Sequence, residues 1–194
     1  MMKKYLFIIT IIFLSAHARA QTGLKSGTLA PEFTATDNSG KTLDLKSLLK
    51  SHKAVVLFFY RGQWCPYCNK HIKQLEDSLH LLTNKGAYVI GVTPETADNI
   101  NKTIDKTHAS FSIIQDKGYN IMKAYKVNYT VDADMFSKLK NYGIDLEKNN
   151  GNNDHVLPVP ATYVIDRSGK IIFVHFDKDY TRRASVGTIL KVLN

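Results

Sequence analysis

The 194-residue sequence contains only two cysteines, Cys65 and Cys68, and they lie three positions apart. Exported domains that are cross-linked for stability carry several distant cysteines, because closing a long loop removes more entropy from the unfolded chain. A disulfide across three positions constrains almost nothing, so cross-linking does not explain this pair. Metal binding is disfavoured, since one cysteine pair with His71 nearby falls short of four zinc ligands. Haem attachment would need histidine where Asn69 stands.

Long hydrophobic runs are also missing. The longest one near the start, Leu6 to Leu14, has nine residues. As a helix it would span only ~14 Å of a ~30 Å hydrocarbon core, which disfavours a membrane anchor. Lys3 and Lys4 precede the run and Ala18-Arg19-Ala20 follows it, a pattern typical of a secretory signal peptide. We therefore expect cleavage near Ala20-Gln21, an exported protein in the periplasm or outside the cell, and no stable membrane insertion afterwards.

Acidic residues are fewer than basic ones, 17 against 26, which gives a formal net charge of +9. Residues 1–20 carry three of the basic residues and no acidic ones, so the remaining chain has a charge of +6. No block of Lys and Arg alternates with aromatic residues, so we expect no nucleic-acid partner. The remaining 174 residues are enough for one domain with a sizeable core. No repeat or linker divides them, and we predict a single domain over residues 21–194.

The order of predicted elements indicates an α/β protein. The unbroken apolar stretches 54–60 and 87–92 are typical of strands buried on both faces of a sheet. Helices are expected to alternate with strands, which places helices on both faces. We read 126–157 as a loop-rich insertion with a helix near 135–141. The remaining predictions are an entry hairpin within 27–45, helices over 65–84, 94–106, 119–125 and 185–193, and strands over 112–114, 162–166 and 170–176.

The most informative motif is Cys65-Pro66-Tyr67-Cys68, at the predicted change from strand to helix. Pro66 fits the first helical position, where its missing N–H costs nothing. A sulfur at a helix N-terminus faces free amide groups and the positive end of the helix dipole, so we expect the pKa of Cys65 to be lowered. Cys68 lies on the same helix face, within reach for a disulfide. We interpret Cys65 as the attacking thiol and Cys68 as the resolving thiol.

Neighbouring residues complete the predicted site. Arg61, four residues before Cys65, is a candidate to support a thiolate or bind a peroxide oxygen, although a solvent-facing loop arginine is the alternative. Trp64 is expected to form an apolar wall, with core packing as the alternative. Val159 and Pro160 precede a predicted strand and form a candidate cis-proline loop facing the thiols, where substrate would pair with the backbone. The predicted substrate-binding set consists of Trp64, Pro66, Tyr67, Val159 and Pro160.

Three stretches carry a resemblance to a known family. They are Ala30-Pro31-Glu32-Phe33, the run Phe59-Tyr60-Arg61-Gly62-Gln63-Trp64-Cys65-Pro66-Tyr67-Cys68, and the segment from Leu157 to Arg167. They resemble the peroxiredoxin-like branch of the alkyl hydroperoxide reductase/thiol-specific antioxidant (AhpC/TSA) family, as does Asp177 to Arg183. The resemblance covers roughly residues 24–190.

The resemblance implies a thioredoxin-like fold with an N-terminal hairpin and no cofactor. It implies that Cys65 attacks a hydroperoxide to form a sulfenic acid, that Cys68 condenses with it, and that a thioredoxin-like partner reduces the disulfide. Typical members have Thr or Ser where Gly62 stands, and an Arg about where Pro160 stands. Those two positions favour the alternative of an exported thiol–disulfide oxidoreductase acting on protein disulfides. A non-catalytic binding module is the third hypothesis.

Overall fold

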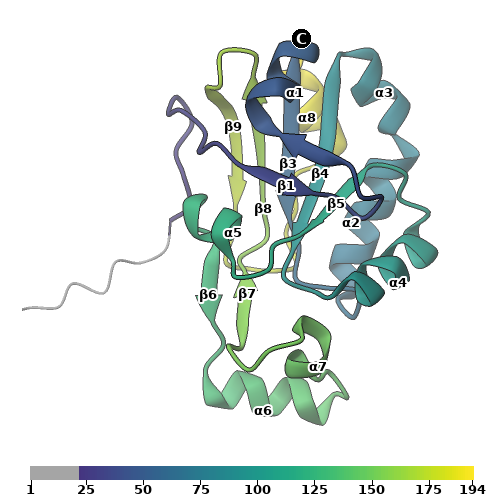
Figure 1. Cartoon of the computed structure of the whole chain (residues 1–194), viewed down its shortest axis with the longest axis vertical. Coiled ribbons are helices and arrows are strands. Elements are labelled where there is room, and N and C mark those ends of the chain that lie inside the picture. Colours follow the sequence, from purple (N-terminus) through teal and green to yellow (C-terminus); the bar gives the residue numbers. More distant parts are fainter. Residues whose placement is uncertain (1–21) are drawn as a thin grey trace, which may run out of the picture.

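The computed structural model describes residues 22–194, so the predicted signal peptide and its cleavage site lie outside the described residues. A five-stranded sheet with the order β5-β4-β3-β8-β9 forms the centre (Figure 1). β3, β4 and β5 run parallel, whereas β8 and β9 are antiparallel to their neighbours. The predicted mixed α/β sheet is confirmed. Its strands are β3 (Ala54–Phe59), β4 (Ala87–Thr93), β5 (Ser112–Gln115), β8 (Ala161–Asp166) and β9 (Ile171–Phe176).

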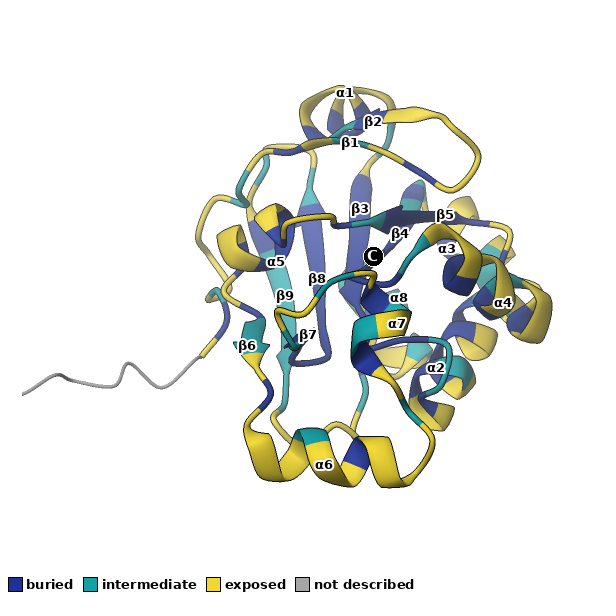
Figure 2. Ribbon diagram, turned by 60° about the horizontal axis from the view of Figure 1, so that its bottom comes forward, coloured by how far each residue is buried: buried dark blue, intermediate teal, exposed yellow. Residues whose placement is uncertain are grey.

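The central strand β3 is buried along its whole length because helices cover both faces of the sheet (Figure 2). Successive side chains of a strand point to opposite faces, so β3 contributes to two cores. Val55 and Leu57 face a core that includes α1 (Leu45–Ser51) and α5 (Asn120–Ala124). Val56 and Phe58 face the other core, formed with α2 (Pro66–Asp77), α3 (Leu79–Asn84), α4 (Ala97–Thr107) and α8 (Val186–Val192).

The helix predicted over 65–84 is two helices. α2 ends at Asp77, and Ser78 leaves helical geometry with φ −110° and ψ 9°. The Ser78 carbonyl then accepts hydrogen bonds from the amides of Leu81 and Leu82, which start α3. The hydrophobic spacing continues across the break because both helices face the same core. Periodicity alone therefore could not reveal the interruption.

The N-terminal hairpin is confirmed as β1 (Thr34–Thr36) paired antiparallel with β2 (Thr42–Asp44). The helix α1 that follows was not predicted. Asp44 caps it, since a side-chain oxygen accepts a hydrogen bond from the Ser47 amide at 2.8 Å. No helix between residues 22 and 194 is long and apolar enough to cross a bilayer.

The insertion is more regular than the predicted loop-rich segment. It consists of β6 (Asn128–Thr130), α6 (Ala133–Asn141), α7 (Leu146–Asn150) and β7 (Val156–Pro158), with β6 and β7 paired (Figure 1). The predicted helix near 135–141 is confirmed. Asp132 and Asp145 cap the two helices, and a small cluster holds the insertion together. The buried members of that cluster are Val131, Leu139, Leu146 and Leu157.

Candidate active site

Cys65 lies where the chain leaves the central sheet and enters α2. It is the N-cap residue of α2, with φ −88° and ψ 109°, and Pro66 takes the first helical position as predicted. The Cys65 carbonyl accepts hydrogen bonds from the amides of Cys68 and Asn69, both at 3.1 Å. This first turn fixes the backbone of both cysteines, so the two thiols are held side by side at the helix N-terminus.

The two sulfurs are in direct contact. Cys65 Sγ and Cys68 Sγ are 2.7 Å apart, and both cysteines are free thiols. Cys65 is 1% exposed and Cys68 is fully buried. The predicted proximity of the pair is confirmed, and a short movement would close a disulfide.

The contact between the two sulfurs couples their ionisation, so that an ionised Cys68 disfavours ionisation of Cys65. Burial opposes ionisation of Cys68, but the hydrogen bond from Cys65 and the positive charge of Arg183 outweigh it and lower the pKa of Cys68 to about 6. The same hydrogen bond, together with burial, raises the pKa of Cys65. The neighbouring Cys68 thus opposes the lowered pKa predicted for Cys65, whereas Arg61 favours it. A Cys68 thiolate in contact with Cys65 raises the pKa of Cys65, whereas the helix dipole lowers it.

Arg183 is a functional residue that the sequence analysis missed. Its Nη2 donates a hydrogen bond to Cys68 Sγ at 3.4 Å, from the segment just before α8. Its Nη1 donates to the carbonyls of Tyr180 and Arg182, which fix the guanidinium in place. The signal was present in the stretch from Asp177 to Arg183, which carried the family resemblance without indicating a role.

Arg61 is buried and does not face solvent. It is 4% exposed, and its guanidinium lies 4.7 Å from the ring centre of Trp64 and 4.3 Å from that of Tyr180. This cation–π arrangement places a positive charge near the thiols, where it favours ionisation of Cys65. The Arg61 backbone also forms a hydrogen bond that stabilises the Cys68 thiolate.

A pocket of about 300 Å³ opens beside Cys65. Its walls come from the loop before α2 and from the insertion, which explains what the insertion contributes to the site. Cys65 lines this pocket, whereas Cys68 does not. The other lining residues are Arg61, Trp64, Pro66, Tyr67, Met135, Lys138, Leu139, Tyr142, Ile144 and Tyr180.

The predicted cis-proline loop is wrong. No peptide bond between residues 22 and 194 is cis, so the Val159–Pro160 bond is trans. The Val159 amide donates to the Val127 carbonyl at 2.7 Å, and both Val159 and Pro160 are buried. The Val159 amide is therefore already paired within the protein, and neither residue lines the pocket beside Cys65.

Glu95 is the second residue that the sequence analysis missed. It follows β4 and is completely buried. Its Oε2 accepts a hydrogen bond from the Gln63 amide at 2.7 Å, two residues before Cys65. Burial, the largest influence, raises the pKa of Glu95 to about 8, and the nearby Cys68 adds to the effect.

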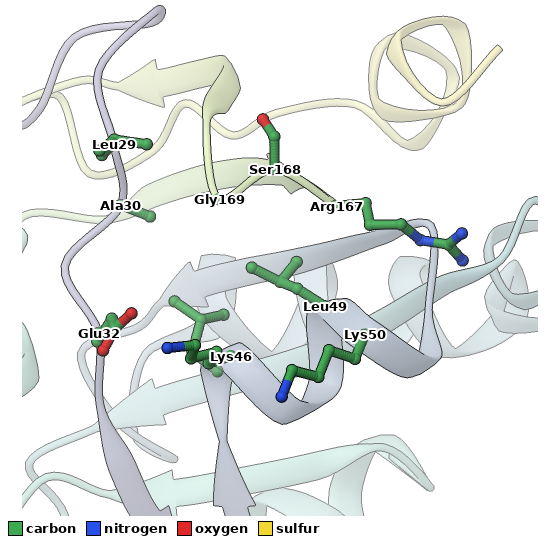
Figure 3. Close-up of a pocket in the computed structure, with 10 residues that line it drawn as sticks. Leu29, Ala30, Glu32, Lys46, Leu49, Lys50, Arg167, Ser168 and Gly169 are labelled. Atoms are coloured by element: carbon green, nitrogen blue, oxygen red, sulfur yellow. The ribbon is translucent and has the colours of Figure 1, made fainter.

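A larger pocket of about 560 Å³ lies at the opposite end of the sheet (Figure 3). Ser168 and Gly169 in its wall belong to the β8–β9 turn, which is level with the start of β3, whereas Cys65 follows the end of β3. It contains no thiol. Within residues 22–194, no group of three or more His, Cys, Asp or Glu side chains is placed to hold a metal ion.

A buried dithiol at the N-terminus of a helix, on a mixed α/β sheet, defines a thiol redox protein of the thioredoxin-like class. The chain belongs to the AhpC/TSA family, whose model matches residues 26–174, and it is a peroxiredoxin-like member. It is 26% identical over 179 residues to a chloroplastic peroxiredoxin Q of Triticum aestivum, covering 90% of this chain and 71% of that protein.

Two further comparisons agree. The chain is 27% identical over 146 residues to a putative peroxiredoxin bcp of Helicobacter pylori strain J99, covering 75% of this chain and 84% of that protein. Its structure is similar to that of peroxidoxin BcpB from Mycobacterium tuberculosis, with a TM-score of 0.67 at 19% identity, covering 88% of this chain and 96% of that one. The predicted family and thioredoxin-like fold are confirmed.

Proposed function

We propose that the protein is a thiol peroxidase that reduces hydroperoxides through Cys65 and Cys68. The observation that carries this proposal is the position of Cys65, which lines a 300 Å³ pocket while being only 1% exposed. A hydroperoxide group is small enough to reach a nearly buried sulfur in the lining of such a pocket. A disulfide on a folded protein is much bulkier, and this geometry favours it less.

The first step needs the thiolate on Cys65. The proton that Cys65 donates to Cys68 crosses only the 2.7 Å contact between the sulfurs, which moves the negative charge to the pocket. Cys65 then attacks the terminal oxygen of the hydroperoxide, and the O–O bond breaks. Cys65 becomes a sulfenic acid, and the leaving alkoxide takes the proton that Cys68 received from Cys65, which makes Cys68 a thiolate again. Arg61 is the positive group of the pocket nearest in sequence to Cys65, and it stabilises the developing charge.

The second step closes the disulfide. Cys68 attacks the Cys65 sulfur and hydroxide leaves as water. The Arg183 guanidinium keeps Cys68 nucleophilic by stabilising its thiolate. A dithiol protein of the thioredoxin type then reduces the disulfide by thiol–disulfide exchange. Trp64, Pro66 and Tyr67 shape the pocket through which the hydroperoxide enters.

The test compares the full-length protein with its Cys65→Ser and Cys68→Ser variants. We expect hydroperoxide consumption, coupled to a thioredoxin and its reductase, to be abolished in Cys65→Ser. In Cys68→Ser, a sulfenic-acid probe should label Cys65 after one equivalent of hydroperoxide. Turnover that survives Cys65→Ser would contradict the assignment. Reduction of insulin disulfides without hydroperoxide turnover would favour the thiol–disulfide oxidoreductase, and absence of both activities would favour the binding module.

We also propose that the protein is exported after removal of residues 1–20. The support is the basic, apolar and small-residue pattern of that segment. Expression of the full-length chain in a bacterium, followed by fractionation and N-terminal sequencing, tests this. The expected product is a periplasmic or secreted chain that begins at Gln21. An intact N-terminus in the cytoplasmic fraction would contradict it.

A further inference from the structure

The Glu95 carboxyl group is buried with one oxygen unpaired. Glu95 is 0% exposed, and its Oε2 accepts the hydrogen bond from Gln63. Its Oε1 has no hydrogen-bond partner among residues 22–194. A buried carboxylate oxygen without a partner costs free energy, whereas a protonated carboxyl group costs much less. The geometry therefore favours a neutral Glu95 in the dithiol form that the structure describes.

Gly62 allows this carboxyl group to approach the cysteine loop. A Cβ atom at position 62 would lie 2.5 Å from Glu95 Oε1 and 2.6 Å from Trp64 Nε1, distances that real atoms do not adopt. Typical family members have Thr or Ser here, three residues before the attacking cysteine. In this chain an acid from the end of β4 fills the space that such a hydroxyl side chain would take.

The charged groups around Glu95 have opposite effects on its ionisation. Lys102 and Lys106 of α4 favour its ionised form, whereas Cys68 of α2 disfavours it. Tyr60, at the end of β3, is buried with its own pKa raised, so it stays neutral. The charge on the cysteine pair is therefore the one nearby charge that changes during the redox cycle. Oxidation to a disulfide removes that negative charge.

We infer that Glu95 stores a proton for the cysteine pair, taking one up when the Cys65–Cys68 disulfide is reduced and releasing it when the disulfide forms. This inference rests on the dithiol–disulfide cycle of the proposed function. Glu95 is a positioning residue, since it acts on the sulfurs through charge and proton supply.

The proton balance closes in both directions. On oxidation, the Cys65 thiol, the Cys68 thiolate, protonated Glu95 and a hydroperoxide give the disulfide, an alcohol, water and ionised Glu95. Two electrons pass from sulfur to the O–O bond, and the two protons needed come from Cys65 and Glu95. On reduction, a dithiol donor supplies two electrons, and its two protons return to Cys65 and Glu95.

The test is the pH dependence of the redox equilibrium between the full-length protein and dithiothreitol. Between about pH 6 and pH 8, where Cys68 is a thiolate and Glu95 is protonated in the reduced protein, we expect the wild type to take up about two protons per disulfide reduced, and Glu95→Gln about one. The extra proton changes the equilibrium constant about tenfold per pH unit, or about 30 mV. Glu32→Gln, an exposed position at the other end of the sheet, should match the wild type.

A second measurement needs no variant. The infrared difference between the reduced and oxidised wild type at neutral pH should show a protonated carboxyl band in the reduced form only. An unchanged proton count in Glu95→Gln, or no carboxyl change on oxidation, would overturn the inference. No hydroperoxide takes part in these experiments. If the peroxidase assay fails while the proton count holds, only the proposed substrate is wrong.

Discussion

The Arg183 guanidinium donates a hydrogen bond to Cys68 Sγ at 3.4 Å, across 115 residues of sequence. This contact joins the segment before α8 to the first turn of α2. Together with the hydrogen bond from Cys65, the positive charge of Arg183 lowers the pKa of Cys68, and so it favours negative charge on that sulfur.

Replacing Arg183 should therefore raise the pKa of Cys68. Removing a positive charge disfavours the thiolate, so we expect Arg183→Ala to raise this pKa by about one unit or more. The hydroperoxide rate near neutral pH should fall severalfold, and Arg183→Lys should restore part of it. The thiolate absorbance in the ultraviolet, followed against pH, measures the change.

Arg182→Ala is the matched control for this prediction. Arg182 pairs with Asp177 and Asp179 on the surface, with 69% of its side chain exposed. We expect its thiolate titration to match the wild type. An unchanged titration in Arg183→Ala would show that the contact with Cys68 has no electrostatic effect.

Gly62→Ala should destabilise the protein. The added methyl group meets Glu95 and Trp64 at distances that force the loop or the carboxyl group to move. Overpacking of this kind costs about 1–3 kcal/mol, measured as a loss in the free energy of unfolding by urea. Gly187→Ala, in α8, is the control. A Cβ atom there would meet only Ser185 Oγ, at 3.9 Å, so we expect no loss in the free energy of unfolding.

A double variant locates the cause of that loss. The double variant Gly62→Ala, Glu95→Ala lacks the carboxyl group that the new methyl group would meet. We therefore expect it to lose less free energy of unfolding than the sum of the losses in the two single variants. Full additivity would mean that Glu95 is not the group that requires glycine at position 62.

Tyr142→Ala should weaken the binding of bulky hydroperoxides. Tyr142 lines the pocket beside Cys65 and is 82% exposed, so its loss should not disturb the fold. If an aromatic hydroperoxide covers about 40 Å² of this ring, the loss is about 1 kcal/mol, or about fivefold in KM. The KM for hydrogen peroxide should not change. Leu81→Ala, an exposed position on α3, serves as the control.

Asp37 should contribute stability that is lost in acid. Burial opposes its ionisation, but hydrogen bonds from Ser112, Ser39 and the Lys41 amide outweigh burial and hold its pKa below 3.8. A depressed pKa in the folded state contributes stability that is complete above the unfolded pKa. That stability disappears as the pH falls through the folded pKa.

We therefore expect Asp37→Ala to lower the free energy of unfolding at pH 7 by about 1–3 kcal/mol. The difference from the wild type should shrink below about pH 4, measured by urea unfolding at several pH values. Asp105→Ala, on the exposed face of α4, should follow the wild-type curve. A difference that stays constant into acid would rule out ionised Asp37 as the source.

The sequence by itself determined the features that depend on nearby residues. The unbroken apolar run 54–60 identified the central strand, and Cys65-Pro66 identified the start of α2. The three-residue spacing of Cys65 and Cys68 placed both sulfurs on one helix turn. In each case the deciding interactions lie within one turn or one strand, so local patterns carry the information.

Only the tertiary structure decided the chemistry around the sulfurs. Arg183 and Glu95 reach the cysteine loop from distant segments, and nothing in the spacing of the motif indicates them. The Val159–Pro160 bond is trans. The Val159 amide, just after β7, donates a hydrogen bond to the Val127 carbonyl, just before β6, and this contact joins segments far apart in the sequence. A pKa depends on burial and on charges within a few ångströms, and folding alone sets both.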